Sequence, residues 1–400
     1  MKAVFLAAGE GNRMRPLTYN RPKVMLPIAN KPIIEYLLIE AREAGIREFV
    51  FIVGYCDEQV RRYFGNGEKW GVSIEYSEQR KQLGTADAIR MVGSMVKGSF
   101  LVINGDIVVS RDDIGQLLND AHNTMSVIRV EDALGLGIVE MDSDRVTGIH
   151  EKTENPPTMM ANAGLYRFTP AVFDAIARTE KSPRGEYEIT DSLRILMDSA
   201  DGLYYREIKS WLDVSYPWDL LRVNESMLES LEPQNLGEIE ENVVIKGSVA
   251  VGKGSVIRSG AYIIGPVIIG EDCEIGPNCY IRPATAIGDG CHIGAAVEVK
   301  NSILMNGSKV PHHNYVGDSI IGERCNLGSG TKIANLRLDK KNIRVTGVDT
   351  GRRKLGAILG DHVETGINVS INVGSIIGHD TFLGPGTVVS GVIQPQSKIF

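Results

Sequence analysis

The sequence predicts two domains of different architecture: an α/β domain with a Rossmann-like sheet over residues 1–230, followed by a left-handed parallel β-helix over residues 231–400. Three observations predict this division. Strand-like and helical segments alternate in the first part, and an aliphatic residue recurs at every sixth position in the second. Glycine is also unevenly spread, with 18 of the 44 glycines in residues 1–230 and 26 in residues 231–400. The acidic stretch 229–241 between the two parts is typical of a solvated connector.

Charge and hydropathy exclude two classes of partner. The 400 residues include 43 Lys and Arg against 50 Asp and Glu, a net charge of −7 that offers no attraction to a nucleic-acid backbone. The longest apolar stretch, Tyr262–Gly270, is far shorter than the roughly 18 residues of a membrane-spanning helix. We therefore expect neither nucleic-acid nor membrane binding, and a cytoplasmic protein.

In the first domain, an apolar run at Lys2–Ala8 ends in glycines, and Pro32–Ala44 then repeats apolar residues at helical spacing before Gly45. This order predicts a strand, a loop and a helix. The same alternation continues through the predicted strands Glu48–Val53, Val72–Tyr76 and Phe100–Ile103 and the predicted helices Thr85–Met95 and Arg111–Ala121. Alternation of this kind predicts a mostly parallel sheet, with ligands beyond the carboxyl ends of its strands.

In the second domain the six-residue period predicts stacked coils. The aliphatic series is Ile239, Ile245, Val251, Ile257, Ile263, Ile269, Ile275, Ile281, Ile287, Ile293, Val299 and Met305. Two positions earlier the residue is usually small: Ser255, Ala261, Cys273, Cys279, Thr285 and Cys291. A β-helix explains both, because each short strand sends one large and one small side chain inward. The period predicts interruptions at Pro311–Gly317 and Asn335–Leu355, and it returns at Ile321, Leu327, Ile333, Leu359, Ile371, Ile377, Leu383 and Val389.

Four of the five cysteines occupy the small inward positions, so we expect them to be core residues. Cys273 and Cys291 lie one coil apart and should stack closely enough for a disulfide. A reducing cytoplasm argues against that bond.

The loop after the first strand has the features of a phosphate site. Gly9 and Gly11 permit a tight turn whose amides can approach phosphates, and Arg13, Arg15 and Lys23 supply positive charge nearby. The loop lacks the Gly-Lys-Ser/Thr of a Walker A motif and has an arginine where the dinucleotide fingerprint has its third glycine.

Residues 1–230 resemble the sugar-1-phosphate nucleotidyltransferases, which join a nucleoside triphosphate to a sugar phosphate and release pyrophosphate. The resemblance rests on the glycine loop with Pro22-Lys23, on Gln82-Leu83-Gly84-Thr85, on Asn104-Gly105-Asp106 and on Trp211-Leu212-Asp213. It implies nucleotide contacts from Leu6, Ala8, Gly9, Gln79, Gly84 and Thr85, and sugar-phosphate contacts from Gly137, Glu151, Lys152 and Asn162.

The chemistry implied is in-line attack of a sugar phosphate oxygen on the α-phosphorus, which requires two polyanions to be positioned and their charge neutralised. By the resemblance, Mg²⁺ is held by Asp106 and Asp213, with Asp219 as the alternative second ligand. Arg13 is expected to hold the departing pyrophosphate, and Lys23 the phosphates at the reacting centre.

In the second domain, Arg282 and Lys300 lie 18 residues apart, which predicts that they stack on one face. Two like charges so placed repel unless an anion such as a sugar phosphate lies between them. Together with His312 and Tyr315 they resemble the acetyltransferase half of the bifunctional enzymes that make UDP-N-acetylglucosamine. The resemblance implies an acceptor and acetyl-CoA site formed by Arg282, Lys300, Tyr315, Asn326, Asn335 and Lys341.

By the same resemblance His312 is the general base that takes a proton from the 2-amino group of glucosamine-1-phosphate, with His313 as the alternative. UTP and dTTP both remain as nucleotide partners, because the insertion Arg15–Arg21 is closer to glucose-1-phosphate thymidylyltransferases. The competing interpretation is a glucose-1-phosphate thymidylyl- or uridylyltransferase whose β-helix only oligomerises or regulates. A flat-faced β-helix also predicts a homotrimer with acetyl sites between subunits.

Overall fold

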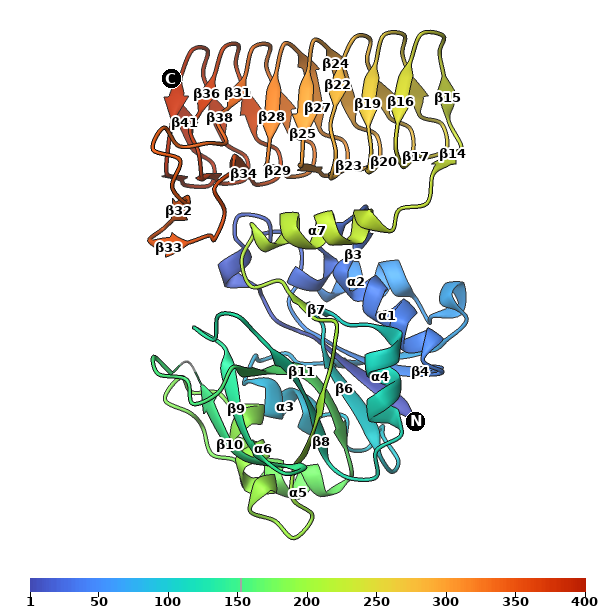
Figure 1. Ribbon diagram of the computed structural model, residues 1–400, viewed down its shortest axis with the longest axis vertical. Coiled ribbons are helices and arrows are strands. Elements are labelled where there is room, and N and C mark those ends of the chain that lie inside the picture. The colour runs from blue at the N-terminus through green and yellow to red at the C-terminus, as the bar shows by residue number, and fades with distance from the viewer. Residues whose placement is uncertain (152) are drawn as a thin grey trace. The chain divides into compact units, whose positions relative to one another are not determined.

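The computed structural model (Figure 1) describes residues 1–151 and 153–400. Contacts between residues divide the chain into two compact units. The first unit consists of Met1–Glu10, Arg21–Met25 and Ile33–Asp213, and the second of Gly11–Asn20, Leu26–Pro32 and Val214–Phe400. The second unit thus includes two N-terminal segments and a helix that precedes the connector.

The first unit contains a nine-stranded sheet that begins as a Rossmann-like array. Its first four strands are parallel, in the order β5-β4-β1-β6, so the strand order reverses between β1 and β6. Ligands of open α/β sheets bind at such a reversal. The four strands are β1 (Lys2–Ala7), β4 (Glu48–Val53), β5 (Ser73–Glu78) and β6 (Phe100–Asn104).

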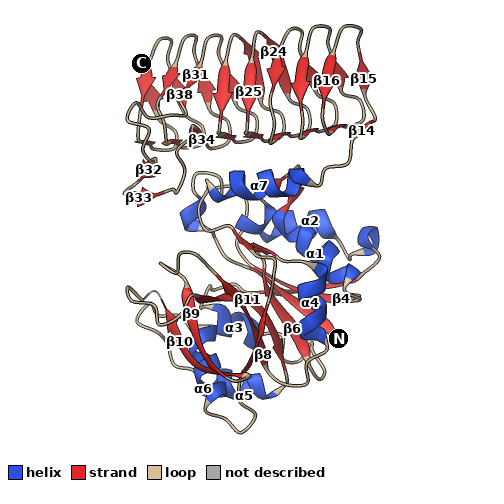
Figure 2. Ribbon diagram, viewed as in Figure 1, coloured by secondary structure: helices blue, strands red, loops and turns tan. Residues whose placement is uncertain are grey.

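Alternate side chains of these strands enter two separate cores. In β1, Phe5 packs into the core beneath α1, α2 and α4, while Val4 packs into the core beneath α3, α5 and α6. The unit is therefore a three-layer α/β/α arrangement (Figure 2). The helices are α1 (Ile33–Glu43), α2 (Asp57–Phe64), α3 (Thr85–Arg90), α4 (Arg111–Leu118), α5 (Ala171–Ala177) and α6 (Ile189–Met197).

The other five strands correct the expectation of a mostly parallel sheet, because most of their pairings are antiparallel. Two of them form a hairpin: Asp142 pairs with Arg145 across a tight turn in which Ser143 has φ 56°. Such a short connection joins only antiparallel neighbours. The five are β8 (Thr124–Arg129), β9 (Gly137–Asp142), β10 (Arg145–Glu151), β11 (Met160–Phe168) and β12 (Tyr204–Glu207).

Most of the second unit consists of three parallel sheets, consistent with a parallel β-helix, because successive strands of the chain enter the three sheets in rotation. The first sheet contains β14 (Gln234–Asn235), β17 (Val249–Val251), β20 (Val267–Ile269), β23 (Thr285–Ile287), β26 (Ile303–Leu304), β29 (Ile320–Ile321), β34 (Ala357–Leu359), β37 (Ser375–Ile377) and β40 (Val392–Ile393). The second contains β15 (Glu238–Ile239), β18 (Val256–Ile257), β21 (Glu274–Ile275), β24 (His292–Ala295), β27 (Lys309–His312), β30 (Asn326–Leu327), β35 (Glu364–Thr365), β38 (Phe382–Leu383) and β41 (Lys398–Ile399). The third contains β16 (Val244–Lys246), β19 (Tyr262–Ile264), β22 (Tyr280–Ile281), β25 (Glu298–Lys300), β28 (Tyr315–Gly317), β31 (Lys332–Ile333), β36 (Ser370–Ile371) and β39 (Val388–Val389).

The inward aliphatic ladder is confirmed along most of its length, since one continuous core runs through these coils. The exceptions in the first coil are Ile239 and Ile245, which are exposed because no coil precedes them to cover that end of the core. Partners are 18 residues apart at first, as in Ile275↔Ile293. From Ile287↔Leu304 to Tyr315↔Lys332 the step is 17, because the corners after Val299 and after Val316 are each one residue shorter. The step is again 18 at Leu359↔Ile377. Leu304, and not the predicted Met305, is therefore the ladder residue.

Of the two predicted interruptions, one is wrong and one is confirmed. Residues Pro311–Gly317 lie within β27 and β28 and pair in register with the preceding coil. The segment Asn335–Leu355 does leave the coils, since Ile321 pairs next with Leu359. Its own short hairpin joins β32 (Arg344–Val345) to β33 (Val348–Asp349). Within the described residues, no helix has the length and apolarity needed to cross a membrane.

Helix α7 (Asp219–Glu229) is fastened to the coils within the second unit. The fully buried Asn224 donates from Nδ2 to the carbonyl of Ala284 at 3.0 Å, and its Oδ1 accepts the backbone N–H of Ala29 at 2.9 Å. Asn30 donates to the carbonyl of Ile287 at 2.7 Å. These buried hydrogen bonds hold α7 and the segment Leu26–Pro32 against the coils, so both belong to the coiled unit.

Candidate functional site

The first candidate site lies at the carboxyl ends of β1 and β6, where the strand order reverses. The backbone N–H of Gly105 donates to the carbonyl of Leu6 at 3.0 Å. A Cβ at Gly105 would lie 2.5 Å from that carbonyl oxygen and 2.8 Å from Val24 Cγ1, so only glycine lets the two strand ends approach. Gly9 has open space where its Cβ would be, which leaves its backbone accessible.

Asp106 follows directly and forms an ion pair with Lys23, whose Nζ lies 2.6 Å from Oδ2. The short strands β7 (Ile107–Val108) and β13 (Leu212–Asp213) pair so that Asp213 lies across from Ile107, one residue beyond Asp106. Asp219 has different contacts: its Oδ2 accepts the backbone N–H groups of Ser215 and Tyr216, which fixes the turn before α7. The geometry therefore favours Asp213 over Asp219 as the partner of Asp106.

Two carboxylates beside a lysine fit a Mg²⁺ ion that is completed by substrate phosphates and water, because Mg²⁺ is usually bound by only one or two protein carboxylates. Across residues 1–151 and 153–400, no group of three His, Cys, Asp or Glu side chains is placed to hold a metal.

The segment predicted to contact the nucleotide, which contains Gln79, Gly84 and Thr85, forms a compact turn before α3. Gln79 is buried and donates from Nε2 to the carbonyl of Gly84 at 3.1 Å and to Asp87 Oδ2 at 3.0 Å. Gly84 has φ 103°, and a Cβ there would collide with the backbone of Tyr187. Thr85 accepts the N–H of Ile189 at 2.9 Å, which ties α3 to α6. The Ala8 carbonyl at the end of β1 also accepts a hydrogen bond from Gln82 at 2.8 Å.

Three of the predicted sugar residues come together on β9, β10 and β11. A Cβ at Gly137 would lie 3.0 Å from Glu151 Oε1 and 3.8 Å from Asn162 Cβ. Asn162 donates to the hydroxyl of Tyr166 at 2.8 Å and accepts the N–H of Gly164 at 3.1 Å. Lys152 lies outside the described residues.

Sequence reasoning missed Tyr166, which is buried beneath this site. Burial raises the pKa of its hydroxyl well above the usual range, and the nearby carboxylates of Glu151 and Asp106 raise it further, so it stays protonated. Gly164 has φ 77° and carries the side chain of Asn104 where its Cβ would be. The sequence signal for this close approach of Asn104 to the backbone is Gly164 itself, because a glycine inside an apolar strand often marks such a contact.

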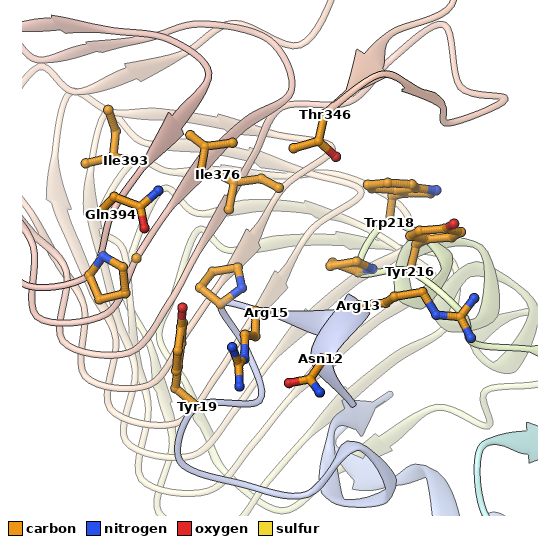
Figure 3. Close-up of a pocket in the computed structure, with 15 residues that line it drawn as sticks. Asn12, Arg13, Arg15, Tyr19, Tyr216, Trp218, Thr346, Ile376, Ile393 and Gln394 are labelled. Atoms are coloured by element: carbon orange, nitrogen blue, oxygen red, sulfur yellow. The ribbon is translucent and has the colours of Figure 1, made fainter. Parts of the chain in front are cut away.

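Arg13 belongs to the second unit, in a 3-10 turn (Asn12–Met14) of the segment Gly11–Asn20. Its guanidinium lies 5.7 Å from the centre of the Tyr216 ring, which stacks on Trp218 at 4.7 Å. Figure 3 shows these side chains around a cavity of about 280 Å³ that is also lined by Arg15 and Tyr19. Arginines over aromatic rings make this cavity suited to an anion.

The second candidate site lies on β22, β25 and β28, where the structure corrects one argument. Arg282 and Lys300 do occupy neighbouring coils, but each has its own carboxylate. Arg282 Nη1 lies 2.8 Å from Glu298 Oε1, and Lys300 Nζ lies 2.9 Å from Asp318 Oδ2. The two cations therefore need no bound anion to offset their repulsion, and their pairing alone does not indicate a phosphate.

Asp318 is the centre of this second cluster, and sequence reasoning did not single it out. Its side chain is only 3% exposed, and its carboxylate accepts hydrogen bonds from Lys300, Asn301 and Asn335. Asn335 also donates to the hydroxyl of Tyr315 at 3.1 Å. Burial is the main cause that raises the pKa of Tyr315. One buried carboxylate thus links three predicted site residues and the neighbouring Asn301. The three are Lys300, Asn335 and Tyr315.

The remaining predicted residues of this site lie further out. His312 is exposed at the end of β27, opposite Ala295, and His313 follows it with φ 50°. Asn326 is exposed on β30, and Lys341 is exposed in the segment that leaves the coils. These side chains are accessible to a ligand.

The cysteines are free, as the sequence argument favoured. Cys273, Cys279, Cys291 and Cys325 are buried in the coil core, and Cys273 and Cys291 remain thiols that donate to backbone carbonyls. Burial raises the pKa of Cys279 and Cys291 to about 12.

Comparisons with known proteins agree with both halves of the chain. A family model described as nucleotidyl transferase matches residues 2–230, and one described as the GMPPB C-terminal domain matches residues 263–382. Among solved structures, the chain is similar to one described as a putative glucose-1-phosphate thymidylyltransferase from Bacillus anthracis in complex with a sucrose. That likeness has a TM-score of 0.53 at 27% identity and covers 59% of this chain and 98% of the other.

Full-length relatives are more informative. The bifunctional protein GlmU of Methanocaldococcus jannaschii is 39% identical over 100% of this chain and 97% of its own length. A bifunctional sugar-1-phosphate nucleotidylyltransferase/acetyltransferase of Sulfurisphaera tokodaii is 40% identical over 98% of this chain and 97% of its own length. A glucose-1-phosphate thymidylyltransferase of Streptomyces antibioticus is 37% identical but covers only 64% of this chain. The chain therefore belongs to the GlmU-type family of bifunctional sugar-1-phosphate nucleotidylyltransferase/acetyltransferases.

Proposed function

We propose that this protein makes UDP-N-acetylglucosamine in two steps. Acetyl transfer from acetyl-CoA to glucosamine-1-phosphate comes first, and uridylyl transfer from UTP to N-acetylglucosamine-1-phosphate, with release of pyrophosphate, comes second. The observation that carries the proposal is full-length similarity, at about 40% identity, to relatives named as bifunctional. We assign the nucleotidylyl step to residues 1–230 and the acetyl step to residues 231–400, a division supported by the family match that ends at residue 230.

For the nucleotidylyl step, the contacts around Asp106 support roles for three side chains. We assign Lys23, whose Nζ lies 2.6 Å from Asp106 Oδ2, to the phosphates at the reacting centre, whose charge it would neutralise. Asp106 and Asp213 would hold Mg²⁺, which when bound neutralises charge on the triphosphate and the sugar phosphate. Arg13, exposed and stacked over Tyr216, is the residue we assign to the departing pyrophosphate.

The neighbouring residues divide between base and sugar. We assign the nucleotide to the backbone of Leu6, Ala8 and Gly9 and to the turn that contains Gln79, Gly84 and Thr85. The open backbone at Gly9 supports phosphate contact there. We assign the sugar to Gly137, Glu151 and Asn162, because the absence of a side chain at Gly137 leaves the Glu151 carboxylate free to approach a sugar hydroxyl.

For the acetyl step we assign the general base to His312. Its exposed ring would take the proton from the 2-amino group as the nitrogen attacks the thioester carbonyl, and the CoA thiolate then leaves. We assign the sugar phosphate to Lys300 and Arg282. Each is already oriented by a carboxylate, and each keeps further N–H donors for the ligand. Tyr315, Asn326, Asn335 and Lys341 complete the proposed acceptor and acetyl-CoA contacts.

A second candidate function is that of a glucose-1-phosphate thymidylyl- or uridylyltransferase whose coils only assemble subunits. The thymidylyltransferase of Streptomyces antibioticus and the Bacillus anthracis structure favour it for the first part of the chain. Neither covers two thirds of this chain, and an assembly domain does not need the buried cluster around Asp318.

One experiment separates the two functions. Purified protein is mixed with acetyl-CoA and glucosamine-1-phosphate, and free thiol is measured. UTP or dTTP with Mg²⁺ is then added, and pyrophosphate is measured. The proposal expects thiol release that depends on the amino sugar, followed by pyrophosphate. Pyrophosphate from glucose-1-phosphate without any thiol release would leave only the second candidate.

We also propose that the coil is left-handed, that the enzyme is a cytoplasmic homotrimer, and that acetyl sites lie between subunits. The exposed Leu336 and Leu338 in the segment that leaves the coils support a contact with another subunit. Light scattering combined with both assays tests this. A folded monomer with full acetyltransferase activity would refute the shared site.

A further inference from the structure

Helix α7 carries a carboxylate that reaches the second candidate site, although the helix lies in the part of the chain matched by the nucleotidyl transferase model. Glu225 Oε1 accepts a hydrogen bond from Asn301 Nδ2 at 2.8 Å and forms an ion pair with Arg352 at 2.7 Å. Asn224, the preceding residue, is fully buried and bonded to the coil backbone at Ala284. The position of Glu225 relative to the coils is therefore set by its own helix.

Asn301 passes this contact on to the buried carboxylate. The same Nδ2 that donates to Glu225 also donates to Asp318 Oδ1 at 2.9 Å. Asp318 in turn accepts Lys300 at 2.9 Å and Asn335 at 2.5 Å, and Asn335 reaches the Tyr315 hydroxyl. Three of the side chains assigned to acetyl transfer are thus joined to Glu225 through two residues.

The carboxylate of Glu225 fixes the orientation of the Asn301 side-chain amide. An amide NH₂ has two hydrogens, and at Asn301 each is taken by one carboxylate, because carboxylates only accept. The Oδ1 of Asn301 is buried and has no hydrogen-bond partner in the described part of the chain. A donor at position 225 would let the amide turn over and satisfy that oxygen. Asp318 would then lose a donor and face an amide oxygen, which a buried carboxylate tolerates poorly.

We infer that Glu225 is a positioning residue of the acetyl-transfer site: it fixes the Asn301 amide so that Asp318 keeps Lys300 and the Asn335–Tyr315 pair in place. The inference rests on the acetyl-transfer function proposed above. Helix α7 lies in the part of the chain that we assign to nucleotidylyl transfer, and the inference gives it a role in acetyl transfer.

The test is Glu225→Gln, with Glu229→Gln as the matched control on an exposed part of the same helix. Acetyl transfer is measured with varied glucosamine-1-phosphate and varied acetyl-CoA, together with pyrophosphate release and the melting temperature. We expect kcat/KM for the sugar phosphate to fall about tenfold, mainly through KM, because the lost hydrogen bond involves charged groups. The KM for acetyl-CoA, the pyrophosphate rate and the control should match the wild type.

A purely structural role would lower the melting temperature and reduce kcat without raising KM for the sugar phosphate, and that result would overturn the inference. The inference would also be overturned if the wild type transfers acetyl groups and Glu225→Gln has the same kcat/KM for the sugar phosphate as the wild type. If the wild type releases no thiol at all, the proposed acetyl function fails first and the inference falls with it.

The route through Asn301 has its own test. Asn301 has φ 44°, so Asn301→Gly removes the amide at a backbone position that glycine tolerates. Adding Glu225→Gln to Asn301→Gly should cause no further rise in KM for the sugar phosphate. Additive effects would show that Glu225 acts by another path and would overturn the proposed one.

Discussion

The α/β unit and the coiled unit assemble their candidate sites in different ways. In the α/β unit, Leu6 and Asn104 are about a hundred residues apart and pair because two parallel strands end at the same edge. In the coiled unit, Arg282, Lys300 and Gly317 meet because each is one coil after the last. At the first site, Gly105 lets the strand ends approach, whereas at the second site the repeat supplies the alignment and the buried carboxylate of Asp318 orients the side chains.

The largest expected effect separates the two sites completely. Asp106→Asn removes the carboxylate that pairs with Lys23 and that we assign to Mg²⁺, so pyrophosphate release should fall by about 10³-fold or more while acetyl transfer is unchanged. Both rates are measured on one preparation, with the exposed Asp112→Asn as control. Equal loss of both activities would refute the two-site comparison.

The reciprocal variant is His312→Ala, which should lower acetyl transfer about 10²-fold and leave pyrophosphate release unchanged, because it removes the proposed general base. His313→Asn is the matched control, since asparagine tolerates the left-handed backbone at that position. If His313→Asn loses acetyl transfer and His312→Ala does not, the base is His313.

Glycine substitutions test whether the two sites use glycine differently. Gly105→Ala places a methyl group 2.5 Å from a backbone oxygen that cannot move freely, so the free energy of unfolding should fall by about 2–3 kcal/mol. Gly317→Ala meets the ends of the Tyr315 and Asn335 side chains at 2.6 and 2.7 Å, which can shift. It should cost about 1 kcal/mol but lower acetyl transfer.

Denaturant unfolding with both activity assays measures these losses. Gly9→Ala is the stability control, because nothing lies within 4 Å of the added Cβ. A larger loss of stability for Gly317→Ala than for Gly105→Ala would contradict the proposed difference between the two sites.

The smallest effect concerns thiol reactivity. Cys56 in the α/β unit is partly exposed, while the four coil cysteines are buried and the pKa of two of them is raised to about 12. At pH 8 we expect one rapidly reacting thiol per native chain, abolished by Cys56→Ser, and five after unfolding. More than one rapidly reacting thiol in the folded protein would mean that the coils open readily.

Much of the fold was predictable because the coil repeats. The six-residue period located the core residues from Val251 to Val299, and it failed at Met305 because one corner is a residue shorter. A period cannot reveal the length of a single corner. Strand and helix alternation likewise predicted the first four parallel strands, but not the antiparallel strands that follow, because pairing direction depends on connections that propensity does not encode.

Site residues that belong to a sequence motif could be predicted, and residues that matter through their buried contacts could not. Lys23 and Asp106, which both come from motifs, form a close ion pair. The repulsion argued for Arg282 and Lys300 was wrong because Glu298 and Asp318 neutralise them, and the sequence does not state which carboxylate lies beneath which cation. Asp318 and Tyr166 were missed because their importance lies in what they contact inside the fold.

The division of the chain between its units also bears on how the protein folds during synthesis. The chain passes from the first unit to the second and back twice before residue 33, and then again after Asp213. Asn30 finds its partner at Ile287, 257 residues later, and Tyr19 packs against His379. On a ribosome, the emerging α/β sheet can form while these early segments wait for the coils to be translated. The segment that carries Arg13 is therefore among the first to be made and among the last to gain its contacts.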